Sequence, residues 1–526
     1  MGTKNFSNAN DLITFSRASA GTALRKIAYG PELVTNGTFD TDTTGWTVNA
    51  SGSLSLSSNR LRITNVSGRG GAYTSFATEV GKVYSISLDV PDSNNPPSAF
   101  WVFSGTAPNT SGNFSVFNQP AGSHEYSFVA SSTTTYLTIY VSNSSVASYT
   151  EFDNISVKEV LFDQGTLTLF NHPAGIPRIE YGADGNVLGL LVEESRTNLL
   201  TYSEDFSNAA WNKANATLTA VEDGFIELEA TNITCYIRDD SLSLVNGTAS
   251  IDVSAGSSNY PYIILLPRNA TDAANQGVAY FDLTDGSVVS ASGTNASAGI
   301  ARNPDGSYRI SFYVDTSASA STNIEVRFGF ASTAGSQLLS AGDTIKFRRA
   351  QFEAGAFPTS YIPTAGATAT RSADVASIPV SAFGYNQSEG TVVVEASISR
   401  VSGVAGTGLI NFTQNSGSTA NATRIFYRGG GNTGVFNSNS GANDVDFTPT
   451  GVLSAGDAVS IAVAYKENDY AASGNGGTVL TDTSNAVPSH ALIEIGGGQQ
   501  YLNGHIKSLR YIPRRLTNSQ LVEITQ

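Results

Sequence analysis

The sequence predicts an all-β protein built from a tandem of antiparallel β-sandwich (jelly-roll) domains. Only 14 % of the 526 residues are charged, and glycine alone contributes 51. Short runs rich in valine, isoleucine, phenylalanine and tyrosine, separated by small polar residues, are typical of strands joined by tight turns. In Ser307–Asp315 and Asn323–Phe330 apolar and polar residues alternate, which predicts strands with one buried and one solvated face.

The charge balance and the hydropathy exclude several classes of partner. The formal net charge is -15, and no basic stripe of the kind that binds nucleic acid is visible, so we expect no nucleic-acid partner. No run approaches the length of a membrane-spanning segment, so we expect no membrane insertion. Met1–Asn10 is polar and lacks the apolar core of a secretory signal, which predicts synthesis in a cytoplasm and later assembly.

Shifts in composition divide the chain into six segments. A short N-terminal arm precedes a first sandwich, a connector with its own strands, a second sandwich, a linker rich in alanine and threonine, and a third domain. In that order the segments span residues 1–30, 31–160, 161–195, 196–366, 367–378 and 379–526. The chain is long enough for this division, since a domain takes about 100–200 residues.

The stretch Gly189–Trp211 lies where the connector meets the second sandwich. The apolar run Val187–Val192 is bounded by turn residues, which predicts a buried strand. The polar segment Glu193–Asn198 then leaves that strand. We therefore interpret the stretch as a hinge between the N-terminal part and everything that follows.

One short helix is expected, close to the C-terminus. Thr517 is followed three residues later by Gln520, and this spacing is typical of a capping box. The preceding strands Thr391–Arg400 and Ala458–Lys466 alternate between apolar and polar positions. The third domain therefore reads as a sandwich that ends in a single helix.

Two frames of residues resemble known carbohydrate-binding families. The frame Glu32–Asp40, Trp46 and Phe152–Val157 resembles the family 4/9-type carbohydrate-binding modules, which are jelly rolls. The strings Arg196–Trp211 and Ile345–Pro363 resemble the opening and the ending of carbohydrate-binding-like domains in tailed-bacteriophage fibre and other virion proteins. The first and second sandwiches are therefore expected to share one architecture.

Further strings add to this resemblance. Phe15–Ser19 and Thr370–Asp374 resemble the flanks of lectin-like domains in phage virion proteins. Leu502–Leu521 resembles the last strand and the terminal helical turn of concanavalin A-like, laminin-G-like jelly rolls, which assigns that fold to the third domain.

The resemblance implies a structural protein of the virion surface: a tail fibre, a head fibre or a capsid decoration that adheres to host surface glycans. The implied partners are other virion proteins and further copies of the chain, with a homotrimer favoured for a fibre. The arm contains apolar residues that need a partner surface, which the connector, a neighbouring subunit or the virion would supply: Phe6, Leu12, Ile13 and Phe15. Two alternatives remain open, a spacer or decoration without a ligand and a polysaccharide depolymerase with accessory binding modules.

No catalytic signature stands out, and we expect the chain not to be an enzyme. The sequence contains no nucleophile elbow, no zinc-protease motif and no phosphate-binding loop. Neighbouring carboxylates such as Glu193 and Glu194 point to opposite faces of a strand, so they do not read as a glycosidase pair. The single cysteine, Cys235, lies in a strand-like alternation and is expected to be a buried structural thiol.

Sugar binding needs aromatic rings on which the CH faces of a sugar pack, together with polar groups that bind its hydroxyls. Trp46 and Trp211 hold equivalent positions in their motifs, which favours core packing, whereas Trp101 is the more plausible platform. A second candidate surrounds the Gly429–Gly431 loop of the third domain, which alternatively is only a hairpin turn. The candidate ligand-binding residues are Trp101, Tyr427, Arg428 and Asn432.

One metal site is expected. Asp40 and Asp42 offer hard oxygen ligands within a turn, and such ligands suit Ca²⁺. In the resembling carbohydrate-binding modules a structural Ca²⁺ often sits where the first acidic motif meets the closing strand, and that resemblance points to Asp40 and Asp153. The alternative is that Asp40 forms the turn and Asp153 is solvated. No other cofactor is expected.

Overall fold

The computed structural model describes residues 13–526 except 50, 95–97, 244–245, 268–276, 318–320, 322, 399–405, 419, 429–430, 440–441, 455 and 498–499. The described chain is dominated by antiparallel strands, with one short α-helix, α1 (Asn518–Ile524), and the 3₁₀ turns η2 (Glu222–Gly224) and η4 (Val380–Ala382). The predicted all-β class is therefore confirmed. The chain forms two compact units, Arg25–Pro173 and a second that combines Met1–Leu24 with Ala174–Gln526.

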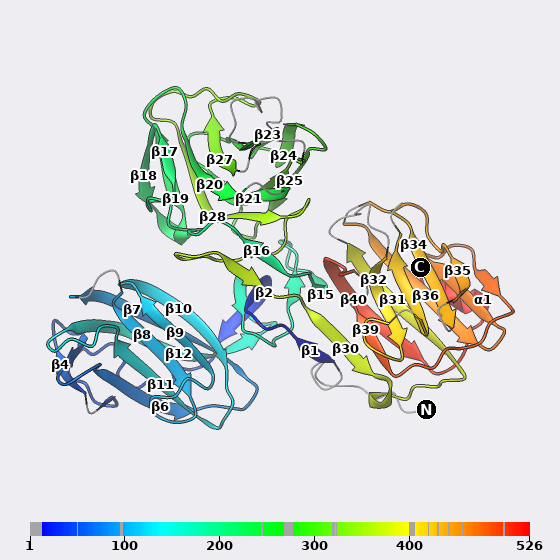
Figure 1. Ribbon diagram of the computed structural model, residues 1–526, viewed down its shortest axis with the longest axis horizontal. Helices are drawn as coiled ribbons and strands as arrows, with labels where there is room; N and C mark the ends of the chain where they lie inside the picture. The colour runs from blue at the N-terminus through cyan, green and yellow to red at the C-terminus, as the bar shows by residue number, and fades with distance from the viewer. Residues whose placement is uncertain are drawn as a thin grey trace. The chain divides into compact units, whose positions relative to one another are not determined.

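The unit Arg25–Pro173 is a β-sandwich of two antiparallel sheets, drawn in blue and cyan in Figure 1. The first sheet runs in the order β10-β7-β12-β2-β13, and the hairpin β4-β5 joins it through β12: β10 (Gly122–Val129), β7 (Val83–Ser93), β12 (Tyr149–Phe162), β2 (Gly21–Tyr29), β13 (Thr166–His172), β4 (Gly52–Leu56) and β5 (Leu61–Asn65). The second sheet contains five strands in the order β3 (Thr47–Val48), β6 (Gly71–Ala77), β11 (Thr134–Val141), β8 (Phe100–Gly105) and β9 (Phe114–Gln119).

The carbohydrate-binding-module-like frame closes this sandwich. The Glu32 carboxylate accepts a hydrogen bond from the backbone N–H of Val157 at 2.9 Å, and the carbonyl of Gly37 accepts one from Ile155 at 2.9 Å. A Cβ atom at Gly37 would lie 1.9 Å from the carbonyl oxygen of Ile155, so only glycine allows this close approach. Trp46 is buried in the core of this sandwich. The frame is thus architectural, and the expected core role of Trp46 is confirmed.

The second sandwich, in residues 196–366, packs two six-stranded sheets. One follows the order β17 (Asn212–Ala214), β20 (Tyr236–Ser243), β27 (Asn323–Ala331), β22 (Tyr260–Pro267), β23 (Gly277–Asp282) and β24 (Ser287–Ser292). The other follows β18 (Ala216–Ala220), β19 (Ile226–Ala230), β28 (Thr344–Ala354), β21 (Gly247–Ala255), β26 (Tyr308–Tyr313) and β25 (Ser297–Arg302). Trp211 and Cys235 both lie in the shared core, as expected, and burial raises the pKa of the Cys235 thiol to about 12.

The C-terminal sandwich draws strands from the arm, the connector and the linker as well as from residues 379–526. One sheet runs β1 (Thr14–Ser16), β30 (Val375–Pro379), β39 (Leu492–Ile495), β32 (Thr407–Thr413), β33 (Ala422–Tyr427), β34 (Thr433–Asn439) and β35 (Ala442–Phe447). The other runs β14 (Ile179–Tyr181), β15 (Val187–Val192), β40 (Gly504–Ile512), β31 (Glu389–Ile398), β36 (Ala458–Lys466), β37 (Tyr470–Gly474) and β38 (Leu480–Asp482).

The arm therefore has a partner surface within its own chain. Its strand β1 pairs with β30, and Ile13 and Phe15 pack against the core of the C-terminal sandwich. Phe6 and Leu12 lie outside the described residues. The connector strand β15 pairs with β40, so the apolar run Val187–Val192 forms the predicted strand. It is buried only from Gly189 to Val192, because Val187 and Leu188 are exposed.

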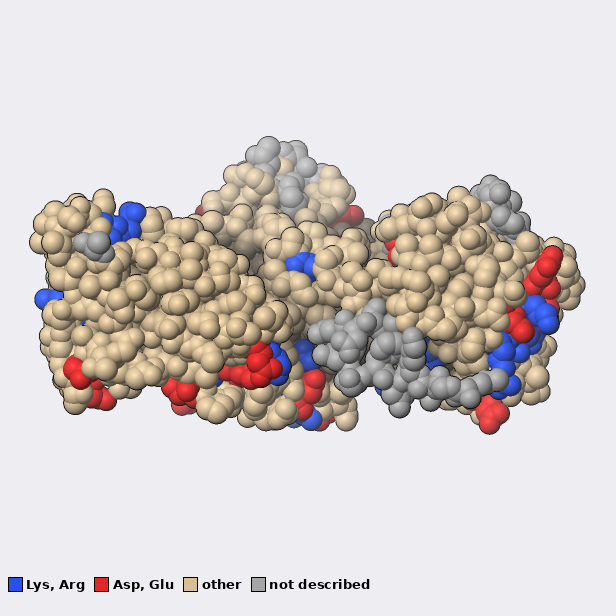
Figure 2. All heavy atoms as spheres, turned by 90° about the horizontal axis from the view of Figure 1, so that it is seen from below, with Lys and Arg blue, Asp and Glu red and all other residues tan. Residues whose placement is uncertain are grey.

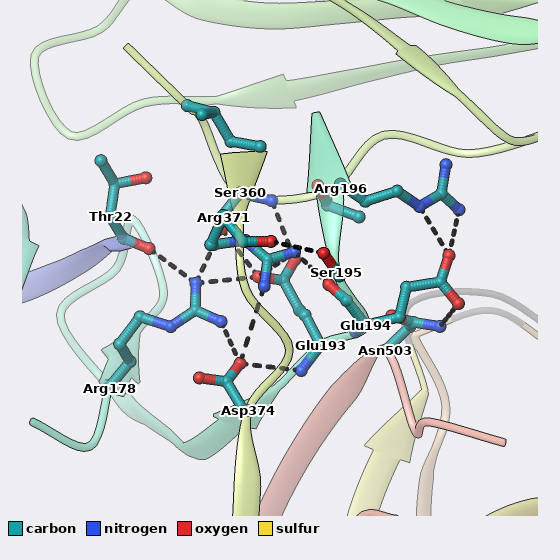
Figure 3. A network of polar contacts seen from close by, with 12 residues as sticks. Thr22, Arg178, Glu193, Glu194, Ser195, Arg196, Ser360, Arg371, Asp374 and Asn503 are labelled. Carbon is teal, nitrogen blue, oxygen red and sulfur yellow. Dashed lines mark hydrogen bonds and ion pairs between the residues drawn. The ribbon is translucent and has the colours of Figure 1, made fainter. Parts of the chain in front are cut away.

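A buried ion-pair network joins the arm, the connector and the linker (Figure 3). Arg178 pairs with Glu193 at 2.8 Å and also with Asp374. Arg17 pairs with Asp374 at 3.1 Å, and Arg371 with Glu193 at 3.5 Å. These five side chains are at most 7 % exposed.

The charge of Glu193 is maintained by its partners. Burial by itself raises the pKa of this carboxyl, but the charges of Arg371 and Arg178 and the hydrogen bonds from Ser360 outweigh burial and lower the pKa to about 2. Figure 3 shows that Glu193 and its neighbour Glu194 turn to different partners, because Glu194 binds Arg196 and Asn503. The predicted hinge segment therefore begins inside a fixed network. A two-stranded sheet of β16 (Arg196–Asn198) and β29 (Ala369–Arg371) continues from it.

On the face shown in Figure 2 the charged side chains form small separate groups, and most of the surface is uncharged. This pattern fits the low proportion of charged residues in the sequence. Among the described residues, no helix has the length and apolar character needed to cross a membrane.

Candidate functional site

The outward side of the sheet β3-β6-β11-β8-β9 carries a cluster of aromatic rings. Trp101 in β8 lies opposite Tyr140 in β11, and Phe103 lies opposite Thr138. Since successive side chains of a strand point to opposite sides, these residues face away from the core residues Phe100, Val102 and Ile139 that alternate with them. We call the outward cluster the aromatic face; it consists of Tyr73, Trp101, Phe103, Phe117, Tyr136 and Tyr140.

The rings of the aromatic face contact one another. The Phe117 centroid lies 5.1 Å from those of both Trp101 and Phe103 in edge-on arrangements, and the centroids of Phe103 and Tyr140 lie 5.5 Å apart. Phe117 is 49 % exposed, and Trp101 and Tyr140 are partly exposed. Contiguous exposed aromatic rings of this kind mark a binding surface more often than a core.

A glycine shapes this surface. Tyr140 stands opposite Gly71 in β6, and a Cβ atom at Gly71 would lie 2.5 Å from the Tyr140 ring. The missing side chain lets the ring of Tyr140 lie flat over the neighbouring strand. A larger residue at position 71 would displace the Tyr140 ring from the aromatic face.

Polar groups surround the rings. Trp101 Nε1 donates to Asn118 Oδ1 at 2.9 Å, and the Tyr140 hydroxyl donates to Asn109 Oδ1 at 2.8 Å. In the described structure no group accepts a hydrogen bond from the side-chain amide nitrogen of either asparagine, so both donors can serve a ligand. The Arg69 guanidinium lies over the Trp101 ring, with Cζ 3.5 Å from the centroid. Partial desolvation lowers the pKa of Arg69 from its usual value, but an arginine stays protonated at neutral pH.

The other predicted ligand-binding residues lie in the C-terminal sandwich and have a different character. Tyr427 is 2 % exposed and packs in the core, so its ring is not available on the surface. Arg428 pairs with Asp446, and its backbone N–H donates to the carbonyl of Asn432 at 2.8 Å. Arg428 and Asn432 therefore close a hairpin turn. This was the alternative to a binding site in the sequence analysis. Gly429 and Gly430 lie outside the described residues.

The predicted calcium ligands have protein partners. Asp40 accepts a hydrogen bond from the Thr38 hydroxyl at 2.7 Å, and Asp153 accepts one from the backbone N–H of Asn154 at 2.8 Å. The carboxylate that the sheet places opposite Asp153 is Asp89, and both line a small cavity that includes Arg60. Within the part of the chain that the structure describes, no group of three or more His, Cys, Asp or Glu side chains could hold a metal ion. A calcium ion here would need carbonyl oxygens as further ligands, and its presence stays a prediction.

Only Trp101 of the aromatic face was recognised from the sequence. Phe117 and Tyr140 were missed because they come from strands far apart in sequence, and only the pairing of β9 and β11 with β8 brings them together. The outward positions of β11, Tyr136 and Tyr140, alternate with apolar core residues. That alternation of aromatic and aliphatic residues was the available signal.

Comparisons with known proteins give fold-level likeness at most. No protein-family model matches the chain, and no curated protein matches it in sequence. One similar solved structure is a heptameric SAP-like pentraxin from Limulus polyphemus, with 12 % identity and a TM-score of 0.23 over 27 % of this chain and 74 % of that chain. A second is the N-terminal tandem of two CBM22 domains from Paenibacillus barcinonensis Xyn10C, with 12 % identity and a TM-score of 0.22 over 63 % of this chain and 99 % of that chain. A third is Trypanosoma rangeli sialidase, with 10 % identity and a TM-score of 0.23 over 96 % of this chain and 93 % of that chain. At these TM-scores the likeness carries no argument about ligand or activity, and none of it points to a bacteriophage.

One expectation from the sequence is corrected by these comparisons. The absence of a familiar catalytic motif led us to exclude an enzyme, but several of the similar solved structures are sialidases, which are enzymes. The expectation that the chain is not an enzyme is therefore withdrawn. At 9–11 % identity these structures do not establish an activity either.

Proposed function

We propose that this protein binds glycans and that the aromatic face of the Arg25–Pro173 sandwich is the binding surface. The observation that carries the proposal is the gathering of Trp101, Phe117 and Tyr140 on one outward sheet surface, next to amide and guanidinium donors. The CH faces of a sugar ring pack on aromatic rings, and its hydroxyls accept hydrogen bonds from groups such as the amides of Asn109 and Asn118.

The environment of the tryptophans supports a surface role for one of them. Trp46 and Trp211 are 7 % and 2 % exposed and belong to the cores of their sandwiches. Trp101 is partly exposed and lies on the opposite side of its sheet from the core. A large aromatic residue is stabilising in a core, so its placement on the outside points to contact with a partner.

A glycan array probed with the labelled full-length chain tests the proposal. We expect binding to a restricted set of glycans, and we expect Trp101→Ala and Phe117→Ala each to weaken it about two- to tenfold, because each variant removes an aromatic contact worth about 0.5–1.5 kcal/mol. Tyr29→Ala is the matched control, since Tyr29 is an exposed aromatic residue in the other sheet of the same sandwich.

Two results would count against the proposal. The full-length chain could fail to bind any glycan on the array, which would favour a spacer or decoration without a ligand. Alternatively, binding could be unaffected by both variants of the aromatic face, which would place the binding surface elsewhere.

As the setting of this activity we propose the surface of a tailed-bacteriophage particle, where the chain would attach to host glycans together with other virion proteins. The support for this setting is the resemblance of Arg196–Trp211 and Ile345–Pro363 to phage carbohydrate-binding-like domains. Immunolabelling of particles with an antibody against this chain tests the setting independently of glycan binding.

A further inference from the structure

We propose that the aromatic face binds acidic glycans, and that Arg69 selects a carboxylate-bearing sugar ring. This inference rests on the proposed function, because it names the class of sugar that the same surface would take. It comes from the environment of Arg69, which differs from that of the other arginines in the Arg25–Pro173 unit.

The first step is the position of Arg69. Its Nε donates to the carbonyl oxygen of Ser142 at 2.9 Å, and its guanidinium lies over the Trp101 ring. These two contacts fix the plane of the guanidinium at the aromatic face. The two terminal nitrogens make no hydrogen bond or ion pair with a residue of the described chain.

The second step is the missing carboxylate partner. The unit contains four arginines. Arg25 pairs with Asp163, and both Arg60 and Arg62 pair with Glu151. Arg69 alone of the four has no carboxylate partner among the described residues, in a chain whose acidic residues outnumber its basic ones by 44 to 29. An arginine that is held in place but not paired is suited to an anion from outside.

The third step is the charge of the surrounding surface. The strands β3, β6, β8, β9 and β11 contain no aspartate, glutamate, lysine, arginine or histidine. An incoming carboxylate would therefore meet no negative side chain on this sheet. The low polarity of the neighbouring rings strengthens the attraction between the carboxylate and Arg69 relative to the same pair in water.

Together these features favour a pyranose ring whose carboxylate accepts hydrogen bonds from the Arg69 terminal nitrogens while a CH face of the ring packs on the aromatic side chains. Guanidinium and carboxylate match in geometry and form strong charge-assisted pairs. Uronic acids and sialic acids share this chemistry, so the experiment must distinguish the two.

The test measures dissociation constants of the full-length chain for a polymer of galacturonic acid and a polymer of sialic acid. Each polymer is compared with the same polymer after its carboxylates have been methyl-esterified. We expect at least one acidic polymer to bind about tenfold or more tightly than its ester, and we expect added salt to weaken the binding of the acid.

Arg69→Gln should reduce this preference for the acid over its ester about tenfold, and Arg69→Lys should retain part of it. The control Arg60→Gln removes an arginine of the same unit that is already paired, and it should leave the preference unchanged. The wild-type comparison of acid and ester needs no variant, so it stands even if Arg69→Gln does not fold.

Binding of the esters as tightly as the acids, or a preference that survives in Arg69→Gln, would overturn this inference and leave glycan binding intact. A preference whose binding is insensitive to Trp101→Ala would also overturn it, since the acid would then bind elsewhere. A chain that binds neither these polymers nor any glycan on the array would overturn the proposed function itself.

Discussion

The three tryptophans of this protein occupy two kinds of environment, and the difference carries most of the functional argument. Trp46 and Trp211 fill cores next to Phe39 and Phe206, whereas Trp101 faces outward under Arg69. The roles of the first two were predictable because each follows the same opening motif. The role of Arg69 was not, because a sequence does not show which charged residue lacks a partner.

At the residue scale, His490 should make stability depend on pH. Its ring contacts the Tyr385 hydroxyl at 2.6 Å and the Thr423 hydroxyl at 3.3 Å, and burial lowers its pKa to about 3. Below the unfolded pKa of about 6.5 the unfolded chain binds a proton that the folded chain does not, so stability falls as the pH falls from about 6.5 toward 3.

We therefore expect the free energy of unfolding of the wild type to drop, between pH 7 and pH 5, by about 2 kcal/mol more than that of His490→Gln. Urea unfolding at the two pH values measures this difference. Parallel pH dependence in the two proteins would show that the histidine is protonated, or accessible to protons, in the folded state.

The calcium prediction also belongs to single residues. If Asp40 and Asp153 hold Ca²⁺, chelation should lower the melting temperature of the full-length chain, because an ion that binds only the folded state stabilises it. Asp153→Ala should remove the sensitivity to the chelator. An unchanged melting curve for the wild type with chelator would leave both aspartates in the hydrogen bonds that they make with Thr38 and Asn154.

At the scale of elements, the period-two alternation of apolar and polar residues predicted where the strands lie. It did not predict whether the outer faces of those strands are exposed to solvent. In β31 the predicted inner residues such as Val392 and Val394 do lie in the core. However, Val393 on the other face is also buried, because α1 and Leu516 cover it. Similarly, Glu325 was expected to be solvated, yet it is buried between Arg238 and Arg327.

The C-terminal helix was predictable because its start depends only on residues close together in the sequence. The Thr517 side chain accepts from the Gln520 N–H, and the Gln520 side chain accepts from the Thr517 N–H, as the spacing predicted. A capping box needs only residues three positions apart. The ion-pair network needs residues from three segments that are far apart in sequence, and no local pattern predicts that.

The network should contribute strongly to the junction of arm, connector and linker. Asp374→Ala removes the carboxylate that pairs with both Arg17 and Arg178, and it leaves Glu193 as the one carboxylate of the network beside three buried arginines. Since breaking a buried ion pair on one side costs about 3–5 kcal/mol, we expect a loss of that size in chemical unfolding of the full-length chain.

The control for this experiment is Glu395→Ala, which removes an ion pair with Arg510 at the surface. Exposed pairs contribute at most about 1 kcal/mol. Equal effects of the two substitutions would mean that the network is not buried in solution as it is in this structure.

At the scale of the whole molecule, the sequence predicted three sandwiches, and the strand pairing adds how the segments between them are used. β1, β14, β15 and β30 from the arm, connector and linker all extend the sheets of the C-terminal sandwich. This could not be predicted, because short strands pair with edges that are distant in sequence. In the sequence, the Arg25–Pro173 sandwich is inserted between two segments that belong to the other unit.

The predicted homotrimer is tested by light scattering on the purified full-length chain, which should give three times the mass of 55.0 kDa. Deleting residues 1–12 leaves Arg17 and β1 in place, and it should yield monomers if Phe6 and Leu12 make the contact between subunits. A monomeric full-length chain at micromolar concentration would contradict self-assembly and favour docking of the arm on another protein.

The central claim, that glycans bind at the aromatic face, is tested most directly by tryptophan fluorescence. Trp101 is the only tryptophan outside the cores, so a bound glycan should change its emission in a saturable way that matches the binding curve. In Trp101→Phe, which keeps an aromatic ring, the change should disappear while the signals of Trp46 and Trp211 remain. A glycan-induced change that persists in Trp101→Phe, or glycan binding to the wild type without any change, would contradict the account.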